Sequence, residues 1–234
     1  PDPRDVAAFA AAPAEVRDRI AAACARVGRD PSAVTLVAVS KTVPAERLRA
    51  AIAAGIVVLG ENRVQEAEEK VPLLPPAEWH LVGRLQSNKV SRALTLFAHL
   101  GSVDSRALAE RIDRLAPAAG RSRVPIWLQV NVDADPAKGG WEPDLLTREL
   151  PALLALPSVE VRGLMTVGRL VATADEARPT FTRLRALATD LRAAHPGLGP
   201  GLSMGMTDDY AVAVEEGSTL VRVGRAIFGT RPAP

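Results

Sequence analysis

An apolar stretch near the start of the chain has the composition of a buried strand: Val34-Thr35-Leu36-Val37-Ala38-Val39-Ser40-Lys41-Thr42. Its aliphatic and β-branched residues favour a strand that is covered on both faces, as in parallel sheets. The stretch leads to Lys41, one of only four lysines among the 29 lysine and arginine residues. Two interpretations stay open: a surface lysine that happens to end a strand, or a nucleophile. A desolvated lysine amine can lose its proton and attack a carbonyl, which an arginine cannot do.

Seven more apolar runs follow this one and alternate with amphipathic segments. The predicted strands are Val34–Val39, Ile56–Leu59, Trp79–Val82, His99–Val103, Ile126–Val130, Val159–Gly163, Gly201–Ser203 and Leu220–Val223. Helical spacing between strands is illustrated by Leu108, Ile112 and Leu115. Strands that alternate with helices pair in parallel through crossover helices. Eight such units predict an α/β fold, a single (β/α)8 barrel of the TIM type.

The organisation around this barrel is simple. A helix over about Glu15–Val27 is expected before the first strand, as an addition to the barrel. No long linker or low-complexity segment interrupts the alternating pattern, so residues 1–234 are predicted to form one domain.

Composition argues against several classes of partner. The formal net charge is only +2 and aromatic residues make up 3% of the chain, so neither a basic surface nor a stacking platform for nucleic acid is predicted. No run reaches the roughly 18 apolar residues that a membrane-spanning helix needs. The alanine-rich start is broken by Pro3 and Pro13, so we expect no secretory signal and a cytoplasmic protein.

Metal chemistry is not expected from the sequence either. Cys24 is the only cysteine, which excludes a disulfide within the chain and a cysteine-built metal site. The histidines are His80, His99 and His195, and their spacing does not match that of metal ligands. The expectation is a protein without a metal.

The barrel prediction locates the functional site. TIM barrels carry their chemistry at the carboxyl ends of the strands and often hold phosphate in the loops after strands 7 and 8. Lys41 follows the first predicted strand, and glycine-containing segments over 203–209 and 222–229 follow the last two. Glycines let backbone N–H groups approach an anion closely, whereas Asp208 and Asp209 would repel one. A lysine able to form an imine beside a phosphate cradle indicates pyridoxal 5′-phosphate (PLP).

Ordered motifs along almost the whole chain point the same way. They are Ala38–Thr42, Gly60–Glu66, Trp79–Lys89, Ser102–Ser105, Gln129–Asn131, Arg162–Met165, Ser203–Asp209, Val221–Gly224 and Ile227–Gly229. On these motifs, which lie within about residues 15–231, the chain resembles the PLP homeostasis proteins. These are single-domain relatives of the alanine racemase barrel.

The resemblance implies a role for each residue of the cofactor site. Lys41 would carry PLP as a Schiff base, the internal aldimine, and Arg222 would face the pyridine nitrogen. A permanently charged donor cannot accept a proton, so the ring nitrogen would stay unprotonated and the cofactor would be a poorer electron sink. Ser203, Gly205 and the backbone around Gly224 would hold the phosphate.

Other matching residues have less certain roles. Asn62 would face the cofactor, or it could be an ordinary helix cap. Lys89 is a second lysine that could take PLP over from Lys41, against the default of a solvated helix lysine. Lys138 lies in a segment expected to be a surface loop, and whether it also binds PLP stays open. His80 could be a satisfied core histidine.

The chain also departs from the family pattern. The family often has a histidine before Ser-Val-Asp-Ser, but Gly101 precedes Ser102 here and the histidine is displaced to His99. The change puts local loop geometry in doubt and touches none of the expected cofactor contacts.

Three functions fit these sequence features. The preferred one is a non-catalytic protein that holds PLP and buffers or supplies it to PLP-dependent apo-enzymes, expected as a monomer. The alternative is an amino-acid racemase, which needs a second proton-transfer group, usually a tyrosine from an extra β domain. The only tyrosine is Tyr210, expected on the helix after the phosphate loop, and the chain runs only to Pro234. The third is a barrel that binds another phosphorylated metabolite without an imine.

Overall fold

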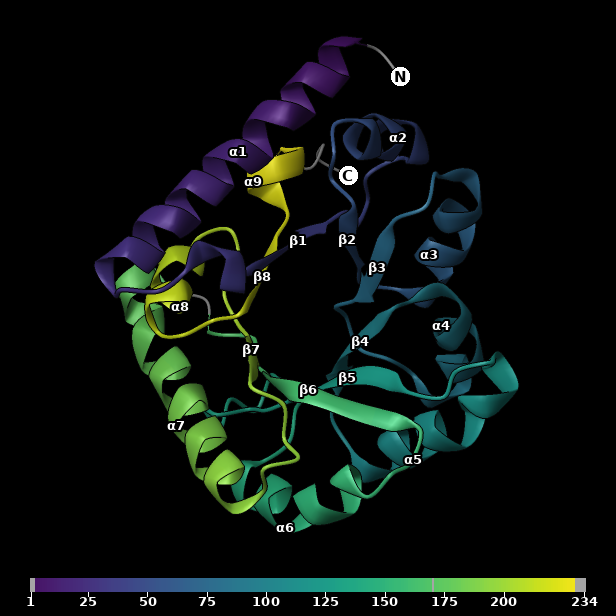
Figure 1. The fold of residues 1–234 in the computed structure, drawn as a ribbon, viewed down its shortest axis with the longest axis vertical. Coiled ribbons are helices and arrows are strands. Elements are labelled where there is room, and N and C mark those ends of the chain that lie inside the picture. Colours follow the sequence, from purple (N-terminus) through teal and green to yellow (C-terminus); the bar gives the residue numbers. More distant parts are fainter. Residues whose placement is uncertain (1–2, 170, 230–234) are drawn as a thin grey trace.

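The computed structural model describes residues 3–169 and 171–229. Eight parallel strands form a closed barrel in sequence order, as predicted. Strands β1 to β8 are Thr35–Val39, Val58–Glu61, Glu78–Leu81, His99–Val103, Val124–Gln129, Val159–Met165, Gly201–Ser203 and Leu220–Val223. Figure 1 shows the strands around the centre and the helices outside them.

The helices connect the strands and cover the barrel. Helices α1 to α9 are Pro3–Arg26, Ala45–Ala53, Val64–Lys70, Val90–Leu96, Arg106–Leu115, Pro143–Leu154, Arg178–Ala194, Tyr210–Glu215 and Arg225–Phe228. Short 3₁₀ turns η1 to η5 are Pro31–Ala33, Val71–Leu73, Ser87–Lys89, Pro117–Ala119 and Ala174–Ala177. None of the helices in the described ranges is long and apolar enough to cross a membrane.

The predicted strand boundaries lie within two residues of those observed. The second strand shows why they differ. Its predicted start, Ile56, donates its backbone N–H to the carbonyl of Ala51 and so completes the end of α2. Pairing with β3 begins only at Val58, opposite Glu78. The helix end takes a hydrogen bond that the strand would otherwise use.

The first helix differs most from its prediction. It begins at Pro3, not near Glu15, and continues through Pro13. Phe9 is buried, packs edge-on against Phe228 with ring centroids 5.7 Å apart, and lies under the Arg47 guanidinium. This packing of α1 on the barrel offsets the backbone hydrogen bond that an interior proline removes. Figure 1 shows α1 lying along the outside, over α8 and α9.

The barrel interior is filled by a small apolar layer. Its buried members are Val37, Trp127, Met165 and Leu220. Gly201 makes room for this layer, because a Cβ there would lie 2.5 Å from the ring of Trp127. A larger apolar core lies between the strands and the helices. The one-domain prediction for residues 1–234 stays a prediction, since it extends beyond the described ranges.

Candidate functional site

The register of the barrel brings three of the predicted site residues to one edge. Ala38 of β1 lies opposite Val223 of β8, and Val39 lies opposite Gly60 of β2. Lys41 lies two positions after the end of β1, and Asn62 and Gly224 directly follow β2 and β8, so the three residues surround the same carboxyl-terminal mouth. Lys41 and Asn62 are half-buried.

A buried ionic network fixes the backbone on both sides of Lys41. The ammonium of Lys70 donates to Glu61 Oε1 at 3.0 Å, to Glu66 Oε1 at 2.6 Å and to the carbonyl of Ser40 at 3.1 Å. The Ser40 hydroxyl donates to Glu61 Oε1 at 2.7 Å, and the Thr42 N–H donates to Glu66 Oε1 at 2.5 Å. The residues before and after Lys41 are therefore both held by charged groups.

The two carboxylates of this network differ in environment. Glu61 is fully buried, and burial raises its pKa although Ser40 and Lys70 act to lower it. Burial would also raise the pKa of Glu66, but hydrogen bonds from Lys70 and Thr42 outweigh burial and leave it lowered. Lys70 therefore stabilises two negative charges at once.

Sequence reasoning missed this network. Lys70 was visible as one of four lysines, and its spacing of four residues from Glu66 indicates a helical ion pair. Its contact with Glu61 depends on how α3 packs behind β2, which no local pattern shows.

Arg222 is held inside the mouth from β8. It is 6% exposed, and its guanidinium donates to Ser203 Oγ at 2.7 Å and to the carbonyl of Thr166 at 2.8 Å. Burial lowers its pKa to about 10, and the nearby Asp209 acts against that shift. The guanidinium still stays charged at neutral pH. Ser203 is the residue expected to hold phosphate, and its hydroxyl oxygen accepts the hydrogen bond from Arg222.

Removal of the Ser203 hydroxyl should weaken the fold. Ser203→Ala takes an acceptor from a buried charged donor, so we expect the free energy of unfolding to fall by about 1–3 kcal/mol. Urea denaturation measures the change. Ser91→Ala, on an exposed position of α4, serves as control and should stay within about 0.5 kcal/mol of the parent. Equal effects of the two substitutions would contradict the assigned bond.

The loop after β7 is tightly folded around Gly205. This glycine has a φ of +96°, and a Cβ there would lie 2.6 Å from the Ala213 Cβ and 2.9 Å from the Tyr210 Cα. A residue with a side chain would be strained by both the backbone angle and the contact. Gly205 is thus required by the local geometry.

The two acids expected to repel a phosphate are both engaged. Asp209 is 7% exposed and accepts the Met206 N–H at 2.6 Å through Oδ1. Burial raises its pKa, opposed by that hydrogen bond and by Arg222. Asp208 forms an ion pair with Arg225. The positive charges of Arg222 and Arg225 therefore offset the negative charges of Asp209 and Asp208 around this loop.

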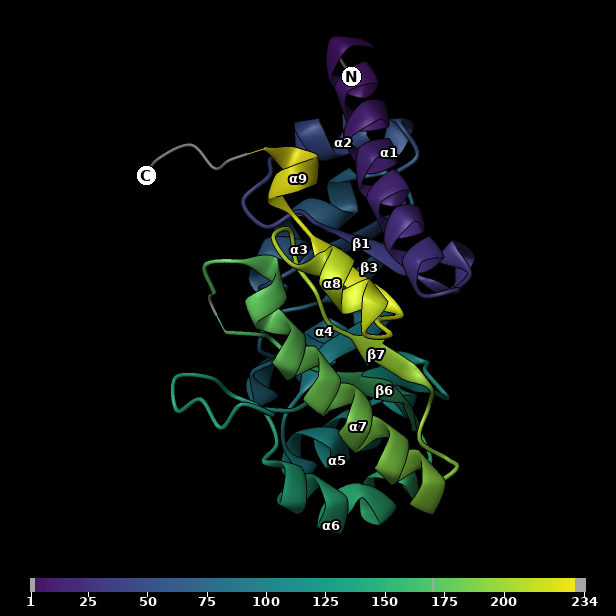
Figure 2. The same ribbon diagram turned by 90° about the vertical axis from the view of Figure 1, so that its left-hand side faces the viewer.

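The other lysines of interest are placed differently. Lys89 and Asn62 line one cavity of about 410 Å³ together with Gly83, between the ends of β2 and β3. The Lys138 ammonium donates to the carbonyls of Val167, at 3.1 Å, and Gly168. It thereby ties the loop after β5 to the loop after β6, and Figure 2 shows both loops reaching out on the same side.

His80 does not reach this mouth. It lies on β3 directly opposite His99 of β4, close to Glu78 at the amino-terminal start of β3. The structure therefore separates this histidine from the other motif residues.

Comparison with known proteins defines the class of this barrel. The model of the alanine racemase N-terminal domain family matches residues 13–232. The solved alanine racemase from Corynebacterium glutamicum shares the fold with a TM-score of 0.74, at 16% identity over 96% of this chain and 61% of that chain. The chain is therefore a barrel of the alanine racemase N-terminal type.

Curated relatives and a solved structure narrow the class. Relatives named pyridoxal phosphate homeostasis protein are 40% identical in Aquifex aeolicus, covering 92% of this chain and 95% of theirs, and 42% identical in Pseudomonas aeruginosa, covering 93% and 94%. The structure of PipY from Synechococcus elongatus with PLP bound is 44% identical, with a TM-score of 0.80 over 92% of this chain and 100% of that chain. The chain belongs to the pyridoxal phosphate homeostasis protein family, which confirms the resemblance predicted from the motifs.

Proposed function

We propose that this chain binds PLP reversibly through an imine on Lys41 and serves as an intracellular store or supply of the cofactor, without robust catalysis. The observation that carries the proposal is the meeting of Lys41, Arg222 and the Gly205 loop at one barrel mouth. The family name of the relatives and the PLP-bound PipY support the choice of ligand.

The residues at the mouth fit the parts of PLP. The cofactor supplies an aldehyde and a phosphate: the lysine amine adds to the aldehyde carbon, and one water leaves as the C=N bond forms. Backbone groups around Gly205 and Gly224 would face the phosphate, with Arg225 beside Asp208. Arg222 would donate to the ring nitrogen, while Ser203 orients its guanidinium. Asn62 and Lys89 would border the cofactor from the neighbouring cavity.

The position of Tyr210 supports a non-catalytic role. Tyr210 is 1% exposed at the start of α8, and its ring lies under the Arg19 guanidinium of α1, 5.2 Å from the ring centroid. Its ring therefore lies in the packing between α8 and α1, outside the strands. Racemisation needs a proton-transfer group on each face of the cofactor, and this tyrosine is not placed to act as the second one.

An assay of alanine racemisation tests this choice against the racemase alternative. The purified, PLP-loaded protein is incubated with L-alanine, and D-alanine is measured by chiral chromatography. We expect no more product than free PLP gives at the same concentration. Robust racemisation that disappears in Lys41→Ala would overturn the non-catalytic assignment.

The same chemistry suits a supply role. An imine is hydrolysed by water, so Lys41 can release the intact aldehyde to PLP-dependent apo-enzymes.

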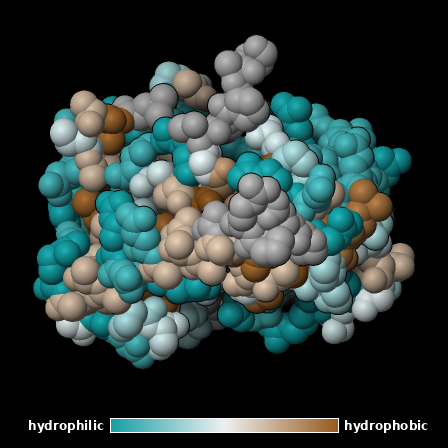
Figure 3. Space-filling model, turned by 90° about the horizontal axis from the view of Figure 1, so that it is seen from above, coloured by the Kyte–Doolittle hydropathy of each residue, from teal (hydrophilic) through white to brown (hydrophobic). Residues whose placement is uncertain are grey.

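The exposed large apolar side chains in the described ranges are Val27, Val57, Leu73 and Leu145. They come from separate elements, and on the face drawn in Figure 3 hydrophobic residues are scattered among hydrophilic ones. We propose a monomer on this basis.

A further inference from the structure

The residue directly after Lys41 has a backbone conformation that its own side chain disfavours. Thr42 has a φ of +67°, and Ala134 is the only other non-glycine residue in the described ranges with a positive φ. A β-branched residue in this left-handed region is a steric outlier. Strained conformations of this kind persist only where the surrounding structure holds them, and they gather at functional sites.

The strain of Thr42 belongs to a tight turn that also contains Lys41. The Val43 N–H donates to the carbonyl of Ser40 at 3.0 Å, which closes a β-turn with Lys41 in its second position and Thr42 in its third. A positive φ at the third position alone is the pattern of a type II turn, which normally places glycine there. Thr42 therefore occupies a position that the turn itself favours for glycine.

Charged groups of α3 hold this turn from both sides. Glu66 Oε1 accepts the Thr42 N–H at 2.5 Å, and the Lys70 ammonium donates to the carbonyl of Ser40 at 3.1 Å. The two side chains are joined to each other at 2.6 Å. Hydrogen bonds to ionised groups are stronger than those between neutral groups, so they can keep the strained turn in place.

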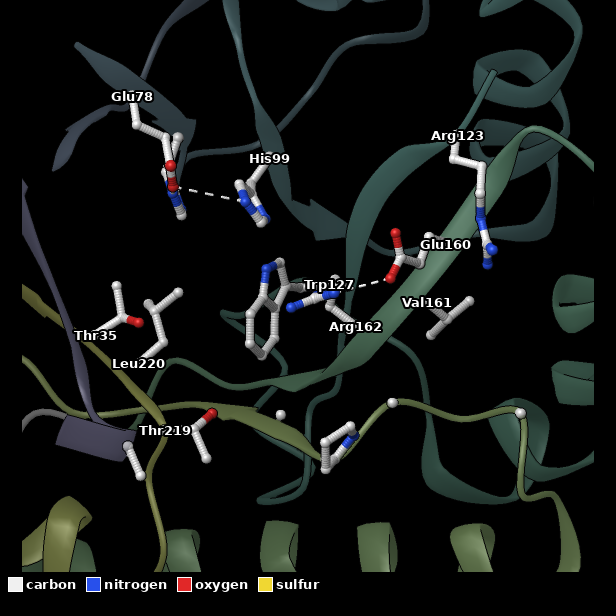
Figure 4. A pocket seen from close by; sticks show the side chains of 16 residues that line it. Thr35, Glu78, His99, Arg123, Trp127, Glu160, Val161, Arg162, Thr219 and Leu220 are labelled. Carbon is white, nitrogen blue, oxygen red and sulfur yellow. Dashed lines mark hydrogen bonds and ion pairs between the residues drawn. The ribbon is translucent and has the colours of Figure 1, made fainter. Parts of the chain in front are cut away.

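The opposite end of the barrel lacks this combination of strain and charge. A cavity of about 670 Å³ lies there, and neither of the two non-glycine residues with a positive φ lines it. Its charged groups are paired with each other: Glu78 lies 2.7 Å from His80, and Glu160 lies 2.8 Å from Arg162. Figure 4 shows the pair of Glu160 and Arg162 in the wall of this cavity. The strained turn and its charged supports are thus features of the Lys41 end.

We propose that Glu66 is a positioning residue for Lys41: it keeps Thr42 in the left-handed conformation and so holds the backbone of Lys41 in the form that binds PLP. The inference rests on the proposed function, because the role is defined toward the ligand of Lys41. A turn that is already ordered before the cofactor arrives lowers the entropy lost on binding. Lys70 supports the same arrangement through Glu66 and the Ser40 carbonyl.

Titration of the purified protein with PLP, followed by the visible band, tests the proposal. We expect Glu66→Ala to bind PLP roughly tenfold more weakly than the parent, and Glu66→Gln, which keeps an acceptor oxygen, to lie between them. Glu68→Ala is the matched control, because Glu68 lies on the same helix but pairs with Arg92, at 3.2 Å. It should bind PLP like the parent. Circular dichroism checks that each variant is folded, and Glu66→Gln replaces Glu66→Ala in every comparison if the latter is not.

Substitution of Thr42 separates positioning from general destabilisation. Glycine adopts this φ without strain, so in the Thr42→Gly background the addition of Glu66→Ala should weaken binding by less than about twofold. Valine is β-branched like threonine, so in the Thr42→Val background the same addition should again weaken binding roughly tenfold. Urea denaturation should show a loss of stability in all three backgrounds, because Lys70 loses one of its two carboxylates in each.

Two results would overturn the proposal: parent-like affinity in Glu66→Ala, or an equal loss of affinity on adding Glu66→Ala to the parent, Thr42→Gly and Thr42→Val. Either result, with a visible band in the parent, leaves the proposed function standing. A parent protein that gives no band with PLP would contradict the proposed function itself, and the positioning role of Glu66 would fall with it.

Discussion

Lys41→Ala should abolish the visible absorption band of the PLP-loaded protein at every cofactor concentration. The band requires a C=N bond to the protein, and an alanine side chain offers no amine. Lys41→Arg is the sharper variant, because it keeps the positive charge at this position but cannot form an imine. We expect both variants to lose the band completely and to remain folded, as shown by circular dichroism.

Lys89→Ala is the matched control for this result. Lys89 lines the neighbouring cavity and is half-buried like Lys41, so the two substitutions remove the same chemical group at the same mouth. We expect Lys89→Ala to keep the band. A normal band in Lys41→Arg, or loss of the band in Lys89→Ala alone, would show that Lys89 carries the imine instead of Lys41.

Lys70→Met should destabilise the protein by about 3–5 kcal/mol, the cost of removing one partner from a buried ion pair. The substitution keeps the volume of the side chain but leaves Glu61, which is fully buried, without its cation. Glu66 loses the same ammonium. Urea unfolding at neutral pH measures the loss, and Lys89→Met should change stability by less than about 1 kcal/mol.

A second substitution checks the cause of that loss. Glu61→Gln made in the Lys70→Met background removes the uncompensated charge, so the double variant should be more stable than Lys70→Met alone. Surface substitutions usually change stability by no more than about 0.5 kcal/mol. If Lys70→Met is within that range of the parent, or if the double variant is no more stable than Lys70→Met, the network does not stabilise the fold as described.

The pH dependence of Lys70→Met follows from Glu61. Burial raises the folded-state pKa of this carboxyl and Lys70 acts to lower it, so the folded-state pKa should be raised further in Lys70→Met than in the parent. A carboxyl with a raised folded-state pKa contributes stability that is present below the unfolded pKa and is lost as pH rises through the folded pKa. The variant should therefore lose more stability over this range than the parent. The deficit of Lys70→Met should therefore be smaller at about pH 5 than at about pH 8.

The sequence was informative where function depends on position along a strand. Alternation of apolar runs predicted the barrel, and the barrel rule placed Lys41 and the loops after β7 and β8 at one mouth. The start of α1 was missed, because Pro13 signals a helix break, and contacts distant in sequence, such as that of Phe9 with Phe228, compensate for it.

Contacts across strands could not be predicted in the same way. His80 and His99 are 19 positions apart and stack on each other because β3 and β4 pair in that register, so their spacing in the sequence did not indicate the contact. The hydrogen bond from Arg222 to Ser203 likewise joins two strands, β8 and β7, that pair with each other. Local patterns identify candidate residues, whereas register decides which of them touch.

The central claim is that PLP is held on Lys41, and peptide mapping after borohydride reduction tests it most directly. Reduction converts the imine into a stable secondary amine and so marks the lysine that carried the cofactor. The chain has four lysines, Lys41, Lys70, Lys89 and Lys138, and mass spectrometry distinguishes them. We predict the pyridoxyl label on the peptide that contains Lys41. A label confined to Lys89 or Lys138, or no label at all, would contradict the account.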